Sequence, residues 1–404
     1  MAKPEIRLKG FKGEWSATQL SQIAKFSKGH GYSKSDLCEQ GTPIILYGRL
    51  YTNYSTEIDC VDTYVKMKEG SVLSKGREII IPASGETPED IACASVVNRD
   101  GIILGGDLNI FSIDEKKYNP AFTALSITYG KVHNELAKYA QGKTVVHLHN
   151  AEISKATIQY PQGIEEQVAL ADYFKSLDSM IQGVTKKIAS LKQMKQACLV
   201  SMFPQAGETK PRVRFKGFKG EWQEKSFGEL YYHNVIKNDM SFNVSKVISV
   251  ANMYFNPNTY ISDPNYLRTY NIFRLGDIAF EGNKSKNFAH GRFVENTIGD
   301  GIVSHVFEVF SPINQDYDLN YWKYAINNER IMGKILMRCT KASTMMTNLV
   351  ANDFLKEKIL IPSNDEQKKI GLFFTSLDKQ ISLQEARLEK LKQIKSACLD
   401  KMFV

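Results

Sequence analysis

Two stretches of the chain carry hydrophobic residues at alternating spacings of four and three positions. The first runs from about Glu165 to Met202, and the second from about Asp365 to Met402. A heptad pattern sustained over almost five repeats predicts a long helix with one apolar seam, as in a coiled coil. The seam positions are Leu170, Phe174, Leu177, Ile181, Val184, Ile188, Leu191, Lys195, Cys198 and Met202, and then Ile370, Phe374, Leu377, Ile381, Gln384, Leu388, Leu391, Lys395, Cys398 and Met402.

The seam is interrupted by polar residues. Lys195 and Lys395 occupy equivalent positions, and Gln384 stands where the first stretch has Val184. A polar seam residue often fixes the register of a coiled coil at some cost in stability. We expect each long helix to pair with the other or with a second chain. The alternative is two amphipathic helices, each packed on its own domain.

Short apolar runs bounded by Gly and Pro predict buried strands in two other regions of the chain. The runs cover 43–47, 78–82 and 101–104 in the first region, and 246–250, 277–280 and 301–307 in the second. Each region also carries an amphipathic pattern, over 120–139 and 321–337, which predicts one helix. The fold class is therefore α+β, with two mixed α/β domains and two long helices.

Several sequence boxes occur twice in the chain. Gly-Phe-Lys-Gly-Glu-Trp occupies 10–15 and returns at 217–222, whereas the regions 16–150 and 223–350 do not resemble each other. This indicates a pseudo-two-fold internal repeat, in which one frame holds two different inserts. We expect a first domain over 1–155, a long helix over 156–203, a second domain over 204–355 and a second long helix over 356–404.

Composition and charge place the chain among ordinary folded proteins. It is 43% hydrophobic and 24% charged, with a net charge of +8. Residues 1–200 hold 24 Lys and Arg against 22 Asp and Glu, which leaves a charge of +6 for residues 201–404. A basic excess of this size permits an anionic partner without requiring one. The second half would interact more strongly with phosphates.

The six cysteines form no metal-binding spacing, and no apolar run reaches the ~20 residues that a membrane-spanning helix needs. We expect free thiols, a cytoplasmic location and no membrane partner.

Loops that combine basic, amide, hydroxyl and aromatic side chains are the candidate binding sites. Arg and Lys can neutralise phosphates, and Arg, Lys and Asn can read base edges. The candidate contact residues in the first domain are Tyr47, Arg49, Tyr51, Lys143 and Thr144. Those in the second domain are Asn283, Lys284, Lys286, Asn287, Arg292, Arg338, Lys341 and Ser343. For any single loop, the competing interpretation is an ordinary solvated surface.

Motifs of catalysis are missing. The glycine-rich segments 29–31 and 101–107 lack the remainder of a dinucleotide fingerprint or a P-loop. His147 and His149 have no Cys or acid nearby that would complete a metal site. We therefore expect a chain without catalytic or metal-binding residues.

The paired organisation resembles the specificity (S) subunit of type I restriction–modification systems. The resemblance is carried by the boxes at 10–15 and 217–222 and by the Glu-Gln helix starts at 166–167 and 366–367. The Met-Phe pairs at 202–203 and 402–403 that end the helices complete it. It covers essentially the whole chain.

This resemblance implies a non-catalytic subunit whose two target-recognition domains each read one half of a bipartite duplex DNA site. The two long helices would pack as an antiparallel coiled coil, set the spacer between the half-sites and dock two methyltransferase (M) subunits. S-adenosylmethionine would bind to those M subunits. ATP and Mg would bind to two restriction (R) subunits, so that this chain holds no cofactor.

Two other interpretations stay open from the residues alone. The chain could be a coiled-coil scaffold with two protein- or glycan-binding modules. A stand-alone enzyme is the third interpretation, and the missing motifs argue against it.

Overall fold

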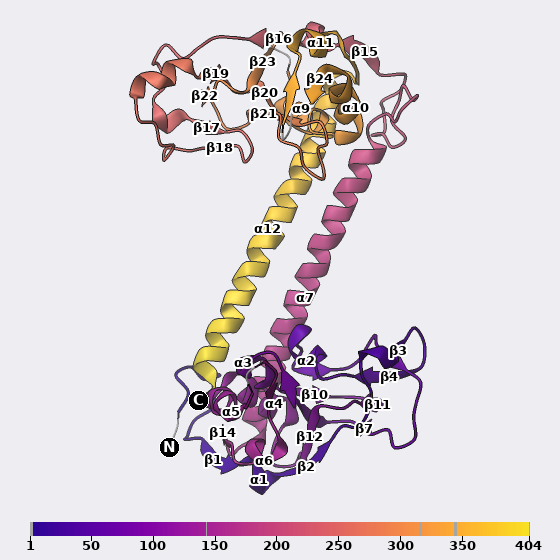
Figure 1. Ribbon diagram of the computed structural model, residues 1–404, viewed down its shortest axis with the longest axis vertical. Coiled ribbons are helices and arrows are strands. Elements are labelled where there is room, and N and C mark those ends of the chain that lie inside the picture. Colours follow the sequence, from indigo (N-terminus) through magenta and orange to yellow (C-terminus); the bar gives the residue numbers. More distant parts are fainter. Residues whose placement is uncertain (1–2, 143, 315–316, 343–345, 404) are drawn as a thin grey trace. The chain divides into compact units, whose positions relative to one another are not determined.

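The computed structural model describes residues 3–142, 144–314, 317–342 and 346–403 (Figure 1). The chain divides into two compact units. Unit 1 comprises residues 1–185 together with 386–404, and unit 2 comprises residues 186–385. Each unit therefore contains one of the two dissimilar regions and a part of each long helix.

The two long helices form where the heptad pattern predicts them. They are α7 (Ile164–Ser201) and α12 (Asn364–Met402). In unit 1, the Tyr173 hydroxyl lies 3.4 Å from the Cys398 sulfur, and Lys395 donates to Asp178. A higher residue number on α7 thus meets a lower one on α12, so the two helices pack antiparallel in this unit.

Unit 2 repeats the same arrangement with the other ends of the helices. Lys192 forms an ion pair with Glu385, and Lys195 forms one with Asp378. The apolar side of the contact is a small buried cluster of Leu191, Leu377 and Ile381. The expected antiparallel pairing is confirmed within each unit.

Unit 1 builds its domain from two five-stranded sheets, ordered β2-β12-β8-β10-β5 and β3-β6-β4-β11-β7, and from two strand pairs, β1–β14 and β9–β13. The strands are β1 (Ser16–Gln19), β2 (Ala24–Lys28), β3 (Leu37–Cys38), β4 (Thr42–Ile45), β5 (Glu57–Ile58), β6 (Tyr64–Val65), β7 (Leu73–Lys75), β8 (Glu78–Pro82), β9 (Ser84–Gly85), β10 (Ser95–Val97), β11 (Asp100–Leu104), β12 (Leu108–Ile113), β13 (Val146–His147) and β14 (Thr157–Tyr160). The helices are α1 (Leu20–Ile23), α2 (Arg49–Thr52), α3 (Pro88–Ile91), α4 (Pro120–Tyr129), α5 (Lys131–Tyr139) and α6 (Asn150–Ile153), with the 3₁₀ turn η1 (Lys34–Asp36).

Unit 2 has a different sheet arrangement, with one four-stranded sheet ordered β16-β23-β20-β21 and the pairs β15–β26, β17–β18, β19–β22 and β24–β25. The strands are β15 (Gln223–Ser226), β16 (Tyr231–Asn234), β17 (Ile248–Ser249), β18 (Tyr254–Phe255), β19 (Asn271–Phe273), β20 (Ile278–Glu281), β21 (Arg292–Glu295), β22 (Gly301–Val303), β23 (Glu308–Pro312), β24 (Thr340–Ala342), β25 (Thr347–Leu349) and β26 (Lys358–Ile361). The helices are α8 (Phe227–Leu230), α9 (Leu319–Ala325), α10 (Glu329–Cys339) and α11 (Ala351–Lys356), with the 3₁₀ turns η2 (Val244–Lys246) and η3 (Pro264–Thr269).

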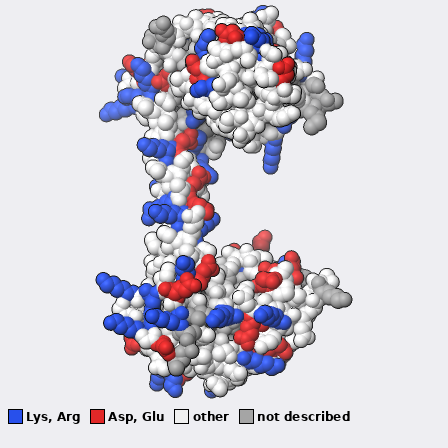
Figure 2. Space-filling view, turned by 90° about the vertical axis from the view of Figure 1, so that its left-hand side faces the viewer, with Lys and Arg blue, Asp and Glu red and all other residues white. Residues whose placement is uncertain are grey.

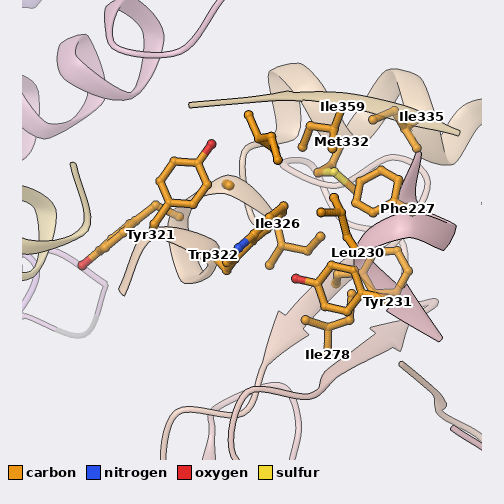
Figure 3. Packing of buried hydrophobic residues seen from close by; sticks show 14 of the residues in the cluster. Phe227, Leu230, Tyr231, Ile278, Tyr321, Trp322, Ile326, Met332, Ile335 and Ile359 are labelled. Carbon is orange, nitrogen blue, oxygen red and sulfur yellow. The ribbon is translucent and has the colours of Figure 1, made fainter. Parts of the chain in front are cut away.

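An aromatic-rich core joins these elements in unit 2. Phe227, Tyr231 and Trp322 lie in one buried cluster with aliphatic residues of α9, α10 and β26, as Figure 3 shows. The rings of Tyr231 and Trp322 meet edge to face, with centroids 5.6 Å apart, which is a favourable aromatic geometry.

Two equivalent ion pairs join the segment just before each repeated box to the start of a long helix, through an arginine three residues before the box. Arg7 binds Glu166 through two hydrogen bonds of 2.7 and 2.6 Å, and Arg214 binds Glu366 through two of 2.7 Å. The glutamate side chains are almost fully buried. A buried carboxylate needs a counter-charge, and the planar guanidinium supplies one with matching geometry. We call these two contacts the Arg–Glu clasps.

The repeated tryptophan of each box packs near the end of a long helix. In unit 1, Trp15 contacts Phe122, which in turn contacts Phe403 just beyond α12. In unit 2, Trp222 contacts Phe203 just beyond α7. Each repeated box therefore packs at the end of a long helix, the first at the end of α12 and the second at the end of α7.

The predicted helices over 120–139 and 321–337 are each divided in the structure, and the prediction of single helices is wrong. Gly130 adopts an extended conformation (φ −86°, ψ −170°) and ends α4 before α5 begins. Asn328 caps α10 by accepting a hydrogen bond from the Arg330 amide at 3.2 Å. Asn favours such N-cap positions because its side chain satisfies an exposed amide.

The two glycine-rich segments lie against each other, and their contact is too close for residues with side chains. A Cβ on Gly29 would lie 1.8 Å from the carbonyl oxygen of Gly105, and the Gly106 amide donates to the Gly31 carbonyl at 2.6 Å. Glycine permits this backbone contact between the end of β2 and the turn before β12.

Loss of one Arg–Glu clasp should destabilise its unit. We expect Arg7→Gln to lower the free energy of unfolding by about 3 kcal/mol, because the Glu166 carboxylate stays buried without its counter-charge. Urea denaturation measures the change. The control is Arg212→Gln, which removes an exposed ion pair with Glu208 and should cost less than about 0.5 kcal/mol. An equal loss in the two variants would contradict the prediction.

Asp277 should make the stability of unit 2 depend on pH. Burial raises its pKa to about 6 from an ordinary value of 3.8. The folded state therefore binds a proton more readily, and this contribution to stability is lost as pH rises from about 4 through about 6. We expect the melting temperature of Asp277→Asn, relative to wild type, to rise between pH 4 and pH 7 in calorimetry. A difference that is constant with pH would refute this assignment.

Candidate nucleic-acid interface

The candidate residues of unit 1 lie on two neighbouring segments. Tyr47 precedes α2 and Tyr51 lies within it, with ring centroids 6.4 Å apart. The Tyr51 ring also lies beside Gly85 of β9, at 3.6 Å from the position that a Cβ would take there. Burial raises the pKa of Tyr51, so its hydroxyl stays protonated and able to donate.

The second segment is the turn that leads into β13. Val146 and Gly85 are paired, and Gln141 and His147 exchange backbone hydrogen bonds, so the turn lies next to the Tyr51 segment. Thr144 is exposed in this turn. Lys143 lies outside the described residues.

Arg49 is the first residue of α2 and contacts the loop before β6. Its Nη2 lies 3.5 Å from the Cys60 carbonyl oxygen. Its Nε and Nη1 atoms are shielded from solvent and have no hydrogen-bond partner among the residues that the structure describes. Because both atoms are shielded from solvent, the Arg49 side chain must move outward before a base edge or a phosphate can accept from them.

In unit 2, two other segments come together. The Thr347 amide donates to the Gly282 carbonyl at 2.8 Å, and the Thr347 hydroxyl donates to the His290 carbonyl at 3.0 Å. Asn283 also pairs with Met346 in a β-bridge. These contacts hold the loop over 282–291 against the β24–β25 hairpin.

Most candidates on these two segments face solvent. The exposed ones are Asn283, Lys284, Lys286, Asn287 and Lys341. Ser343 lies outside the described residues. A loop and a hairpin that present amide and ammonium groups side by side can contact phosphates and base edges together.

Arg292 and Arg338 have partners within the protein. Arg292 donates to Glu281 at 2.7 Å and to the Ala251 carbonyl at 2.9 Å. Arg338 forms an ion pair with Glu357, and this hydrogen bonding raises the pKa of Arg338. Each charge is thus offset by a carboxylate, so these two arginines hold loops in place.

Helix α10 adds basic residues that the sequence analysis did not single out. Arg330 and Lys334 are exposed and precede Arg338 by eight and four residues, which places all three on one helix face. Arg330 and Lys334 line a cavity of about 410 Å³ together with His290. The four-residue spacing of the basic side chains was a signal that could have found this face.

Charge is mixed on the surface that Figure 2 shows, where Lys and Arg are interspersed with Asp and Glu on each unit. The described residues hold no group of three or more His, Cys, Asp or Glu side chains suited to a metal ion. His147 and His149 stack with ring centroids 6.3 Å apart, and Ser84 lies within hydrogen-bond distance of His147 at 3.0 Å. Within the part of the chain that is described, no helix combines the length and apolar character needed to cross a bilayer.

Comparison with known proteins places this geometry in a family. The profile of the type I restriction modification DNA specificity domain matches twice, over residues 12–193 and 219–393. Among curated protein sequences, none matches the chain.

Two solved structures are similar in fold. A type I restriction–modification S subunit from M. genitalium shares 13% identity at a TM-score of 0.61, covering 100% of this chain and 99% of its own. A chain from a study of complex assembly and conformational transition of the type I R-M system shares 13% identity at a TM-score of 0.52, covering 98% of both. Two copies of one domain that together cover most of the sequence decide the assignment: the chain belongs to the type I restriction–modification DNA specificity family, whose members recognise DNA and do not themselves catalyse.

Proposed function

We propose that each unit reads one half of a bipartite, asymmetric duplex DNA site. The paired helices α7 and α12 set the spacer and dock two methyltransferase subunits, which bind S-adenosylmethionine and methylate adenine. Two restriction subunits supply ATP- and Mg-dependent translocation and cleavage. This chain contributes sequence specificity and holds no cofactor.

One observation carries the proposal. The frame is equivalent in both units, down to the paired hydrogen bonds of the Arg–Glu clasps, whereas the sheets differ in strand number and order. Equivalent frames give two domains equivalent attachment, and different sheets give them different surfaces. This is what reading two unlike half-sites requires.

The proposed contacts divide by chemistry. In unit 1, Arg49 would turn outward to read a base edge, while Tyr47, Tyr51, Lys143 and Thr144 would contact the backbone around it. In unit 2, Asn283 and Asn287 would read bases, and the Lys and Ser residues would contact phosphates. Arg292 and Arg338 contribute by holding the loop and the hairpin, unless DNA displaces their glutamate partners.

The test is to co-express the chain with the methyltransferase subunit encoded beside it and to map methylated adenines by single-molecule sequencing. We expect one bipartite motif with a gap of fixed length. Arg49→Ala should relax one half of the motif by roughly 1–3 kcal/mol of discrimination and leave the other half unchanged. Methylation without a bipartite motif, despite a stable complex, would favour the scaffold with protein- or glycan-binding modules.

The unit 2 lysines should act on affinity rather than on sequence. We expect Lys286→Ala combined with Lys341→Ala to weaken DNA binding of the complex equally for target and scrambled duplexes. The slope of log affinity against log salt should fall by about 2, since two phosphate contacts are lost. Fluorescence anisotropy across a salt series measures both effects. Lys356→Ala, an exposed lysine on α11, is the control and should change neither.

A further inference from the structure

Each unit contains one lysine of the helical seam, paired with an aspartate of the opposite helix. In unit 2, Lys195 Nζ lies 2.5 Å from Asp378 Oδ1, and in unit 1, Lys395 Nζ lies 2.5 Å from Asp178 Oδ1. Between 18% and 31% of each side chain is exposed, so both pairs are largely removed from water. We call them the seam pairs.

The two seam pairs belong to one register. In an antiparallel helix pair, residues that face each other have numbers with a constant sum. The residue numbers add up to 573 in both seam pairs. On α7 and on α12 the charged positions are 17 residues apart, or roughly 25 Å along a helix. A single alignment of the two helices therefore satisfies both pairs.

The heptad repeat of the apolar seam does not select this alignment by itself. The aromatic contacts at the helix ends, Phe174 with Phe403 and Phe203 with Phe374, act together with the seam pairs. The residues of the seam repeat every seven positions, so a shift of one heptad again places apolar residues opposite apolar ones. The same shift separates both seam pairs. In one direction Asp178 would face Leu388 and Asp378 would face Ile188. In the other direction the two aspartates would face Met402 and Met202.

A partly buried carboxylate without its counter-charge is costly, so the shifted alignments are disfavoured in either direction. In unit 2 the cost would be higher still. Asp378 also accepts a hydrogen bond of 2.7 Å from the Tyr324 hydroxyl, and Lys195 lies 5.4 Å from the centre of the same ring. A shift would break all of these contacts at once.

We propose that Lys195, Asp378, Lys395 and Asp178 determine the spacer length of the DNA site by selecting the helix register. This inference rests on the proposed function, in which α7 and α12 set the spacer. A shift of one heptad moves one helix by roughly 10 Å along the other, which corresponds to about three base pairs of duplex. The four residues thus act on specificity without contacting DNA.

The test replaces the two pairs by neutral residues of similar size in the full chain, co-expressed with its methyltransferase subunit. The variant combines Lys195→Met, Lys395→Met, Asp178→Asn and Asp378→Asn. We expect methylated sites with unchanged half-sites and a second spacer, about three base pairs longer or shorter, which the wild type does not methylate. The melting temperature should stay equal or rise, because Met suits an apolar seam.

Control variants distinguish an effect on the helix register from an effect on the stability of the helices alone. Variants that neutralise only one pair should keep the single wild-type spacer, since one pair still selects the register. A lower melting temperature with only the wild-type spacer in the four-residue variant would mean that the pairs merely stabilise the helices. That outcome overturns the proposal.

A second readout does not depend on DNA. Lys192 Nζ lies 2.7 Å from Glu385 Oε1 in unit 2, so cysteines in the variant Lys192→Cys with Glu385→Cys should be joined by a short bis-maleimide cross-linker in the native register. We expect the yield of this cross-link, read by peptide mapping of the isolated chain, to fall several-fold when both seam pairs are neutralised. An unchanged yield overturns the register assignment. If the wild type methylates no bipartite motif but the yield falls, the proposed function fails and the register assignment stands.

Discussion

The antiparallel contact between α7 and α12 is the interaction on which both units depend. Neither unit completes its core with one helix alone. In unit 1, Phe174 of α7 packs on Phe403 beyond the end of α12, and in unit 2, Phe203 beyond α7 packs near Phe374 of α12. The helices are therefore core elements of each unit as well as the connection between sequence repeats. Their apolar seam supplies the burial, and charged residues supply the alignment.

The frame of each unit, made of the repeated box and the long helices, and the loops that carry the candidate contact residues are different segments of the chain. The buried carboxylates Glu166 and Glu366 form ion pairs with Arg7 and Arg214, which precede the repeated boxes. The loop charges lie on other segments, where Lys286 and Lys341 are exposed. Loop residues can thus change without leaving a buried charge unpaired. Substitutions in the loops therefore have little effect on the free energy of unfolding.

The sequence predicted the long helices well because their signal is local and repeated. A heptad seam and a Glu-Gln start specify α7 and α12 to within a residue or so at each end. The divided helices escaped prediction, since one glycine at 130 and one asparagine at 328 outweigh an amphipathic pattern. The candidate arginines show a different limit: Glu357 lies 19 residues from Arg338 in the chain, and only the folded backbone brings them together. Charge in a sequence does not tell which charges are already paired.

The division of the chain has a consequence for synthesis. Unit 2 is continuous, whereas unit 1 needs residues 386–404 to complete it. Trp15 and Phe122 therefore lack their contact with Phe403 until all of unit 2 has been synthesised. Domains that emerge first usually fold first. Here the first domain to emerge keeps an open apolar face until residues 386–404 have been made, while the second can complete its core earlier. A chain that stops before residue 386 would leave that apolar face exposed, although the whole of unit 2 would be present.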